Sequence, residues 1–142
     1  MKRDAGFTQI ELMIVVAIIG VLATIAIPNF IAMQDRAREG STKANMHTFQ
    51  ISTEDYGVLN GGAYPASGAS VVALLPGGSP MFKNSFTGLT GSDAAWEDRG
   101  NFAGPATPTP GITSYAASGT ITYNVKGHGK SGPITIILTS GN

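Results

Sequence analysis

An apolar run near the start of the chain constrains its fold more than any other feature. From Phe7 to Ile27 the single charged residue is Glu11, and Pro28 closes the run. As an α-helix this run measures about 31 Å at about 1.5 Å per residue, and a bilayer hydrocarbon core is about 30 Å thick. The run therefore predicts a membrane-spanning helix at the N-terminus.

The residues before the apolar run predict the orientation and the processing of that helix. Lys2 and Arg3 indicate that this end stays on the cytoplasmic side of the membrane. A secretory signal peptide carries its small-residue cleavage site after the apolar core. Here the small pair beside the basic residues, Ala5-Gly6, precedes the core. Cleavage at that pair leaves the hydrophobic helix on the mature protein.

Glu11 is unusual because a carboxylate inside a membrane helix costs about 2.5–3.5 kcal/mol on insertion scales. One interpretation is that Glu11 lies close enough to the helix end to reach the lipid headgroups. Another is that it pairs with a cation at the same depth. Cleavage after Gly6 would supply one, because the new α-amine of Phe7 is positive at neutral pH. Between staggered subunits, the carboxylate of one could meet the amine of the next and favour the correct axial register.

The stretch from Gly6 to Pro28, GFTQIELMIVVAIIGVLATIAIP, resembles the prepilin motif of type IV pilins and pseudopilins. The resemblance implies that a prepilin peptidase cuts between Gly6 and Phe7 and methylates the amine of Phe7. It also implies that Glu11 is the assembly glutamate. Gln9 departs from the family, which usually has leucine there, and a polar amide beside the junction is expected to alter local packing.

Gly20 and Pro28 are the weak points of the predicted helix, because glycine costs about 1 kcal/mol relative to alanine and proline removes a backbone hydrogen bond. Membrane helices tolerate both residues, which is the simpler interpretation. In the resembling family this segment can unwind within the filament and make it extensible. Unwinding of residues 20–28 is therefore a second hypothesis.

Beyond Pro28 the pattern predicts that the helix continues, from about Thr8 to about Asp55 in all, and becomes one-sided. The apolar stripe expected to lie on a sheet has a spacing of three or four, with Thr48 in phase, and consists of Phe30, Met33, Ala37, Ala44 and Ile51.

The rest of the chain is rich in glycine, proline and serine and predicts a small head. Residues 70–75 suggest a short helix or turn, and residues 92–98 a capped helical turn. Alternating apolar residues predict strands at 120–125 and 134–139, joined as an antiparallel hairpin. The fold class is therefore α+β, a long N-terminal helix packed on a small C-terminal antiparallel sheet. The expected division is leader 1–6, transmembrane helix 7–28, amphipathic helix 29–56 and head 57–142.

Composition and motifs exclude most other functions. The formal net charge is zero, so no basic surface for nucleic acid is expected. The loop at 127–132 imitates a glycine-rich phosphate motif, but it leads into a strand at Pro133 instead of a helix. The chain has no cysteine, and its two histidines, His47 and His128, are expected to be surface or capping residues.

The head also lacks a recognisable catalytic arrangement, so we expect no enzyme and no cofactor. Its acidic residues Asp93, Glu97 and Asp98 could in principle ligate calcium, which some secretion pseudopilin heads carry. Their spacing lacks the EF-hand pattern, so a solvated acidic turn is the preferred interpretation.

The resemblance implies a structural subunit that polymerises into a helical type IV pilus. Its expected partners are copies of itself, the prepilin peptidase, the inner-membrane assembly machinery and, before assembly, the membrane. It would lie in the inner membrane first and in an extracellular filament later. The alternative is a pseudopilin of a type II secretion system. A binding protein that is merely tethered is disfavoured, because a tether needs no Glu11.

Overall fold

The computed structural model describes residues 6–141 and contains one long helix and a small α+β head. Helix α1 spans Gln9–Leu59 and belongs to two compact units, one ending at Arg36 and the other beginning at Ala37. The first unit, as described, is helical from Gln9 onward. The second contains the rest of α1 and every other element. The predicted long helix is confirmed, but it ends at Leu59, about four residues later than expected.

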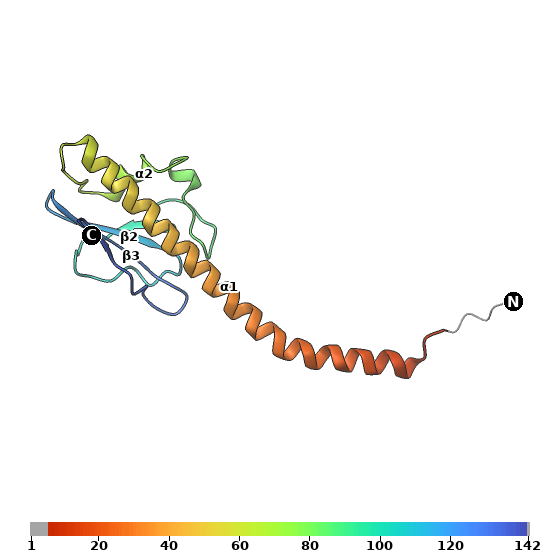
Figure 1. Cartoon of the computed structure of the whole chain (residues 1–142). Coiled ribbons are helices and arrows are strands. Elements are labelled where there is room, and N and C mark those ends of the chain that lie inside the picture. Colours follow the sequence, from red (N-terminus) through yellow and green to blue (C-terminus); the bar gives the residue numbers. More distant parts are fainter. Residues whose placement is uncertain (1–5, 142) are drawn as a thin grey trace. The chain divides into compact units, whose positions relative to one another are not determined.

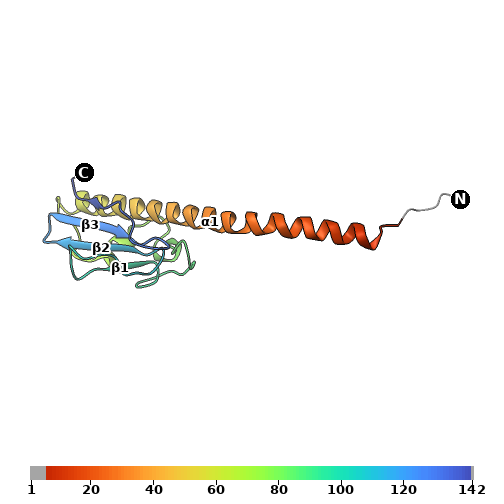
Figure 2. The same cartoon turned by 90° about the horizontal axis from the view of Figure 1, so that it is seen from below.

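The sheet of the second unit has four strands in the order β1-β2-β3-β4. They span Trp96–Asp98 (β1), Thr113–Ser118 (β2), Thr122–Gly127 (β3) and Leu138–Thr139 (β4). Strand β2 pairs antiparallel with β3, and β3 antiparallel with β4. Strand β1 pairs parallel with β2, so the sheet is mixed and not wholly antiparallel as expected. Figures 1 and 2 show the C-terminal part of α1 lying along this sheet.

The predicted hairpin is confirmed, with different strand limits. Strand β3 begins two residues later than expected, so Ile121 lies outside it and is exposed. Only the last two residues of the predicted 134–139 strand pair with β3, through Val125↔Leu138 and Asn124↔Thr139. The capped helical turn expected at 92–98 is wrong, because residues 96–98 form β1. Strand β2 was not predicted.

Short elements connect the helix to the sheet. Helix α2, Gly68–Val72, overlaps the short helix or turn predicted at 70–75, and the side chain of Ser67 caps it by accepting from the Ala69 amide at 3.1 Å. A 3-10 turn, η1, follows at Ser79–Met81. Asp98, at the end of β1, accepts from the Gly68 amide at 2.5 Å and from the Ser67 hydroxyl at 2.7 Å. The carboxylate therefore ties the start of α2 to the sheet.

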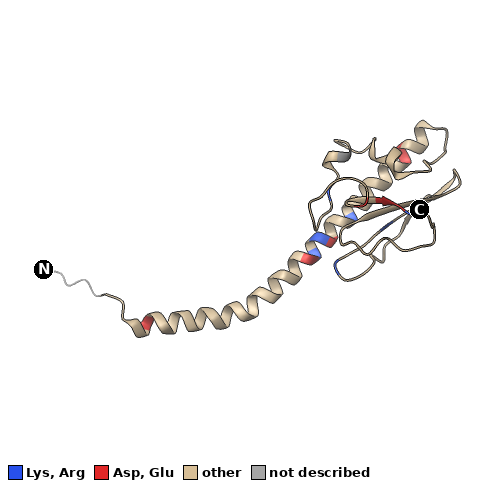
Figure 3. Cartoon of the chain, turned by 180° about the vertical axis from the view of Figure 1, so that it is seen from behind, with Lys and Arg blue, Asp and Glu red and all other residues tan. Residues whose placement is uncertain are grey.

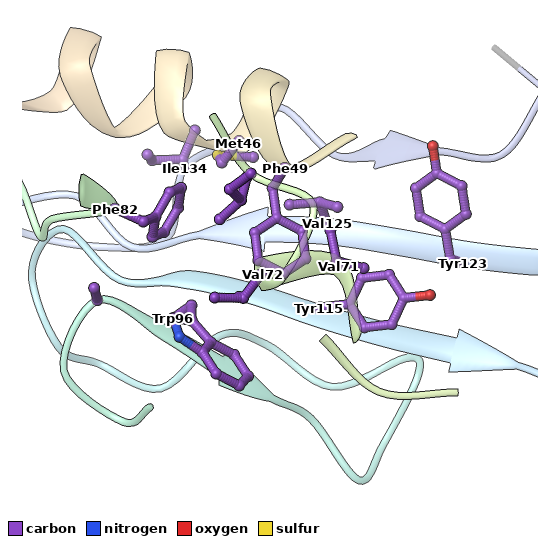
Figure 4. Close-up of a cluster of buried hydrophobic side chains, with 12 residues drawn as sticks. Met46, Phe49, Val71, Val72, Phe82, Trp96, Tyr115, Tyr123, Val125 and Ile134 are labelled. Atoms are coloured by element: carbon purple, nitrogen blue, oxygen red, sulfur yellow. The ribbon is translucent and has the colours of Figure 1, made fainter. Parts of the chain in front are cut away.

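One face of the sheet and the facing side of α1 form the hydrophobic core (Figure 4). Helix α1 contributes Met46 and Phe49, and the sheet contributes Tyr115, Tyr123 and Val125. The Phe49 ring lies 5.7 Å from that of Tyr115, a separation typical of favourable aromatic pairs. The other members of the core are Val71, Val72, Leu75, Phe82, Ala95, Trp96 and Ile134.

The opposite face of the sheet is polar and is covered by residues 99–107. Asn124 donates to the Phe102 carbonyl at 2.9 Å, and the Lys126 ammonium donates to the Gly104 carbonyl at 2.8 Å. From β1, the buried Glu97 carboxylate accepts from the Thr107 amide at 2.7 Å. These bonds hold the covering segment on the sheet, since buried polar groups are stable when they are paired.

Candidate assembly segment

The predicted cleavage junction lies in backbone that precedes the helix. Gly6 and Phe7 are exposed and non-helical, and 84% of Phe7 is accessible to solvent. The other leader residues, including the basic pair Lys2 and Arg3, lie outside the described residues. A protease needs an accessible peptide outside regular secondary structure, and the described part of this junction meets that requirement.

Glu11 takes part in a capping box with Thr8 at the start of α1. The Thr8 amide donates to Glu11 Oε2 at 2.9 Å, and the Thr8 hydroxyl donates to the same oxygen at 2.6 Å. In return the Glu11 amide donates to the Thr8 hydroxyl oxygen at 3.3 Å. This reciprocal arrangement satisfies backbone donors that a helix N-terminus otherwise leaves unpaired.

The capping role of Glu11 was missed by the sequence analysis, although a threonine followed three residues later by glutamate is its usual signature. Within one subunit the carboxylate thus has a structural partner. Both hydrogen bonds that the carboxylate accepts use Oε2. The other oxygen, Oε1, accepts no hydrogen bond from the residues that the structure describes.

The first unit offers an apolar surface that nothing in the described chain covers. From Gln9 to Gln34 its single charged residue is Glu11, and Figure 3 shows this stretch of α1 almost entirely in the colour of uncharged residues. The large apolar side chains of this stretch are all substantially exposed, for example Leu22 at 61% and Phe30 at 65%. Among the described residues, α1 is the one helix long and apolar enough to cross a membrane. The surface suits lipid or other apolar helices.

The two predicted weak points, Gly20 and Pro28, are helical in this structure. Side chains reinforce the backbone around them. The Thr24 hydroxyl donates to the Gly20 carbonyl at 2.9 Å, and the side-chain Nδ2 of Asn29 donates to the Ile25 carbonyl at 3.2 Å. These bonds add a second donor to carbonyls of the turns beside Gly20 and Pro28, whereas the Thr24 carbonyl, four residues before Pro28, is the one that loses its backbone donor. The isolated subunit therefore has a continuous helix through residues 20–28.

The face of α1 that packs on the sheet differs from the predicted face. The buried stripe consists of Thr42, Met46, Phe49, Ser52, Thr53 and Gly57. Of the expected stripe, Ala37, Ala44 and Ile51 are exposed, and Ile51 is 68% accessible. The prediction was wrong because most of the covered positions carry small or hydroxyl-bearing residues, which a search for large apolar side chains does not select. Gly57, for instance, faces the Tyr64 ring, which a Cβ atom at this position would meet at 3.0 Å.

A carboxylate joins the end of α1 to the sheet. Glu54 accepts from the Tyr64 hydroxyl at 2.8 Å and from the Tyr123 hydroxyl through a second short bond. The bond to Glu54 raises the pKa of Tyr64, and burial together with the bond to Glu54 raises that of Tyr123. Both phenols are therefore held in their protonated form.

The acidic residues considered for calcium have other roles. Glu97 is buried and holds Thr107, so a solvated acidic turn is wrong for this residue. Asp98 is exposed, as expected, but it lies at the end of strand β1 and holds the start of α2. Asp93 is exposed in a turn with a φ of 62°. No group of three potential metal ligands occurs among residues 6–141.

The two histidines and the glycine-rich loop show no arrangement for binding a metal or a phosphate within residues 6–141. His47 is exposed on α1, and the His128 ring contacts the Gly129 carbonyl at 2.8 Å. The glycine-rich loop at 127–132 follows strand β3 and bridges back at His128↔Pro133, and it opens no helix that could bind phosphate.

Known proteins are similar to this chain over part of its length. Residues 1–27 match the family model described as the prokaryotic N-terminal methylation motif. The type IV major pilin protein PilA of Myxococcus xanthus is 52% identical over 54 residues, which are 38% of this chain and 24% of that protein. The type II secretion system core protein G of Pseudomonas aeruginosa is 33% identical over 85 residues, which are 58% of this chain and 59% of that protein.

A third relative is the type IV wide pilus major component PilA4 of Thermus thermophilus, 36% identical over 74 residues, 52% of this chain and 56% of that protein. The matches thus span between a quarter and about three fifths of these relatives. No solved structure matches the chain.

Proposed function

We propose that this chain, whose residues 1–27 match the N-terminal methylation motif and whose relatives include type IV pilins and a type II secretion core protein, is the subunit of a helical type IV pilus. Its relatives are structural subunits and not enzymes. The observation that carries the choice of a pilus is the 52% identity to a major pilin over 54 residues. In this proposal residues 1–6 are a leader, 7–28 the assembly helix and 29–142 the amphipathic helix with its head.

Processing is the first step of the proposed function. A prepilin peptidase cuts between Gly6 and Phe7 and methylates the new amine of Phe7. The exposed, non-helical backbone at this junction supports the step. Mass spectrometry of the mature N-terminus is expected to find methylated Phe7. An intact leader, or a cut after Ala26, would refute the processing step.

Assembly follows when the apolar helix exchanges lipid for the helices of other copies. The exposed side chains of the first unit, and the exposed stripe that includes Ala44 and Ile51, support this step. Glu11 would set the axial register between subunits, because its Oε1 could accept a hydrogen bond from the methylated amine of a neighbouring subunit. The electrostatic attraction between the carboxylate and the amine is strongest in a region of low dielectric constant.

Replacement of Glu11 tests the registration step. Glu11→Ala should insert into the membrane and yet assemble few filaments, as measured by electron microscopy and by recovery of sheared material. Asp55→Ala removes an exposed acid from the same helix and serves as the control. Normal filament yield from Glu11→Ala would contradict the pairing.

Residues 20–28 are proposed to lose helical structure inside the filament. The reinforcing bonds from Thr24 and Asn29 are side-chain bonds, which neighbouring helices could replace. A reconstruction of the filament with continuous helical density through Gly20 and Pro28 would count against this proposal.

The second candidate is a pseudopilin of a type II secretion system, which the identity to core protein G over 58% of the chain favours. Both candidates place the precursor in the inner membrane with its assembly machinery. They differ in the product, an extracellular filament or a short envelope structure. Shearing the cells separates them, because recovery of the protein only in the cell envelope would overturn the pilus proposal in favour of secretion.

A further inference from the structure

The end of α1 carries the one Asn-Gly pair of the sequence, Asn60-Gly61. Asn60 is exposed and follows the last helical residue, Leu59. Gly61 has a φ of 67°, and the Gly62 amide donates to the Gly57 carbonyl at 2.7 Å. This is the glycine-terminated helix end that left-handed backbone makes possible.

We propose that Asn60 is a site of spontaneous deamidation that changes the end of α1 as the protein ages. The Gly61 nitrogen loses its proton to hydroxide and attacks Asn60 Cγ. A bond forms between that nitrogen and Cγ, the bond from Cγ to Nδ2 breaks, and ammonia leaves with a proton from water. Water then opens the cyclic imide at either carbonyl and yields an aspartate or isoaspartate at position 60.

The geometry around the attacking nitrogen favours this step. Glycine has no side chain to hinder the approach of its nitrogen to Cγ. The space where a Gly61 side chain would lie is open, with no atom within 4 Å of the Cβ position. Within residues 6–141 the Gly61 amide also donates no hydrogen bond that would hold it away from Cγ. The Asn60 side chain has a single bond, from Nδ2 to the Tyr56 carbonyl at 2.8 Å.

Asn84-Ser85 is the natural comparison, since serine is also a small residue. The Asn84 side chain is 1% exposed, and its Nδ2 donates to two carbonyls, those of Ala94 at 2.8 Å and Pro110 at 2.9 Å. Its Oδ1 accepts from two amides. Four bonds hold this carboxamide away from the following nitrogen, so the fold protects Asn84 and leaves Asn60 reactive.

Deamidation alters the helix end in two ways. A carboxylate cannot donate to the Tyr56 carbonyl, which keeps only its bond from the Asn60 amide at 3.0 Å. The product also places a negative charge at a helix C-terminus, where the macrodipole disfavours it. The last turn, which includes Val58 and Leu59, therefore loosens.

Peptide mapping of the full chain, aged in detergent micelles at mildly alkaline pH, tests the site. We expect the Asn60 peptide to show the mass change of an amide replaced by a hydroxyl, and isoaspartate, while the Asn84 peptide keeps its mass. In denaturant both peptides should change. An unaltered Asn60 peptide after ageing of the folded chain, or equal loss at Asn60 and Asn84, would overturn the proposal.

Two variants test the consequence. Asn60→Asp, which carries the product charge, should show faster amide hydrogen exchange at Leu59 and position 60, as the aged protein does. Asn60→Gln keeps a neutral carboxamide and should neither age nor gain a charge. If exchange in the aged protein and in Asn60→Asp equals that of the fresh protein, the proposed loosening is wrong.

Discussion

The side chain of Asn84 provides the sharpest test of how the head is held together. It is buried, it donates to the Ala94 and Pro110 carbonyls, and it accepts from the Phe86 and Thr87 amides. It thereby joins three separate stretches of irregular chain that form few backbone bonds with one another. Asn84→Ala removes all four bonds at once.

The expected loss follows from these bonds. A net hydrogen bond contributes about 0.5–1.5 kcal/mol, and a buried group left unpaired costs about 1–3 kcal/mol. Thr87 is exposed and Phe86 half-buried, so water can replace the bonds to their amides, whereas the two carbonyls are partly covered. We expect a loss of about 2–4 kcal/mol, which for a unit of this size lowers the melting temperature by about 10–30 °C.

Trp96 supplies the assay, because it is the single tryptophan and belongs to the core. Its fluorescence reports unfolding of the head in the full chain, held in detergent micelles. The matched control is Asn45→Ala, which removes one bond, to the Lys83 carbonyl at 2.8 Å. If Asn84→Ala shifts the transition no more than this control does, the four-bond argument is wrong.

Three further predictions use the same unfolding assay or amide exchange. Met46→Ala should cost about 2–5 kcal/mol because Met46 is buried, whereas Ile51→Ala, on the exposed face, should change stability by less than about 0.5 kcal/mol; similar losses would refute the assignment of the faces. The raised pKa values of Tyr64 and Tyr123 mean that the folded chain retains protons that the unfolded chain releases near pH 10. The contribution of these two phenols to stability should therefore be constant below that pH and fall as the pH rises above it, and Tyr123→Phe should weaken the fall; an unchanged alkaline slope in that variant would contradict the argument. Thr8→Val should lose about 1 kcal/mol of helix capping, seen as faster amide exchange in the first turn of α1, while exchange equal to that of the unaltered chain would exclude the capping box.

The long helix could be predicted from the sequence because nearly every residue of a run of about twenty is apolar. The apolar run, the closing Pro28 and the lone Glu11 agree with one another, and the long helix was confirmed. The partner of Glu11 within the subunit was missed. A carboxylate in a membrane helix predicts a cationic partner, whereas the donors that Glu11 has within the subunit are the amide and hydroxyl of Thr8.

The head was less predictable because its strands are short and because several of its buried residues are small and polar. Strand β2 reads Thr-Ser-Tyr-Ala-Ala-Ser, with one large apolar residue, yet Thr113 and Ser114 are fully buried. The helix face was misassigned for the same reason. Thr42 and Thr53 are fully buried, whereas Ile51 is exposed. Pairing between distant strands decides such positions, and no local pattern encodes it.

The cap at the start of α1 has a consequence for the order of events before and during assembly. Thr8 donates to one oxygen of Glu11, so the carboxylate has a donor within its own subunit. Under the proposed function, this donor would be in place before the subunit leaves the membrane. The amine of a neighbouring subunit would then pair with the second oxygen of Glu11, while the first keeps its bonds from Thr8. In the proposed filament, each subunit would thus bring a carboxylate with one oxygen already hydrogen-bonded and the other available to a neighbour.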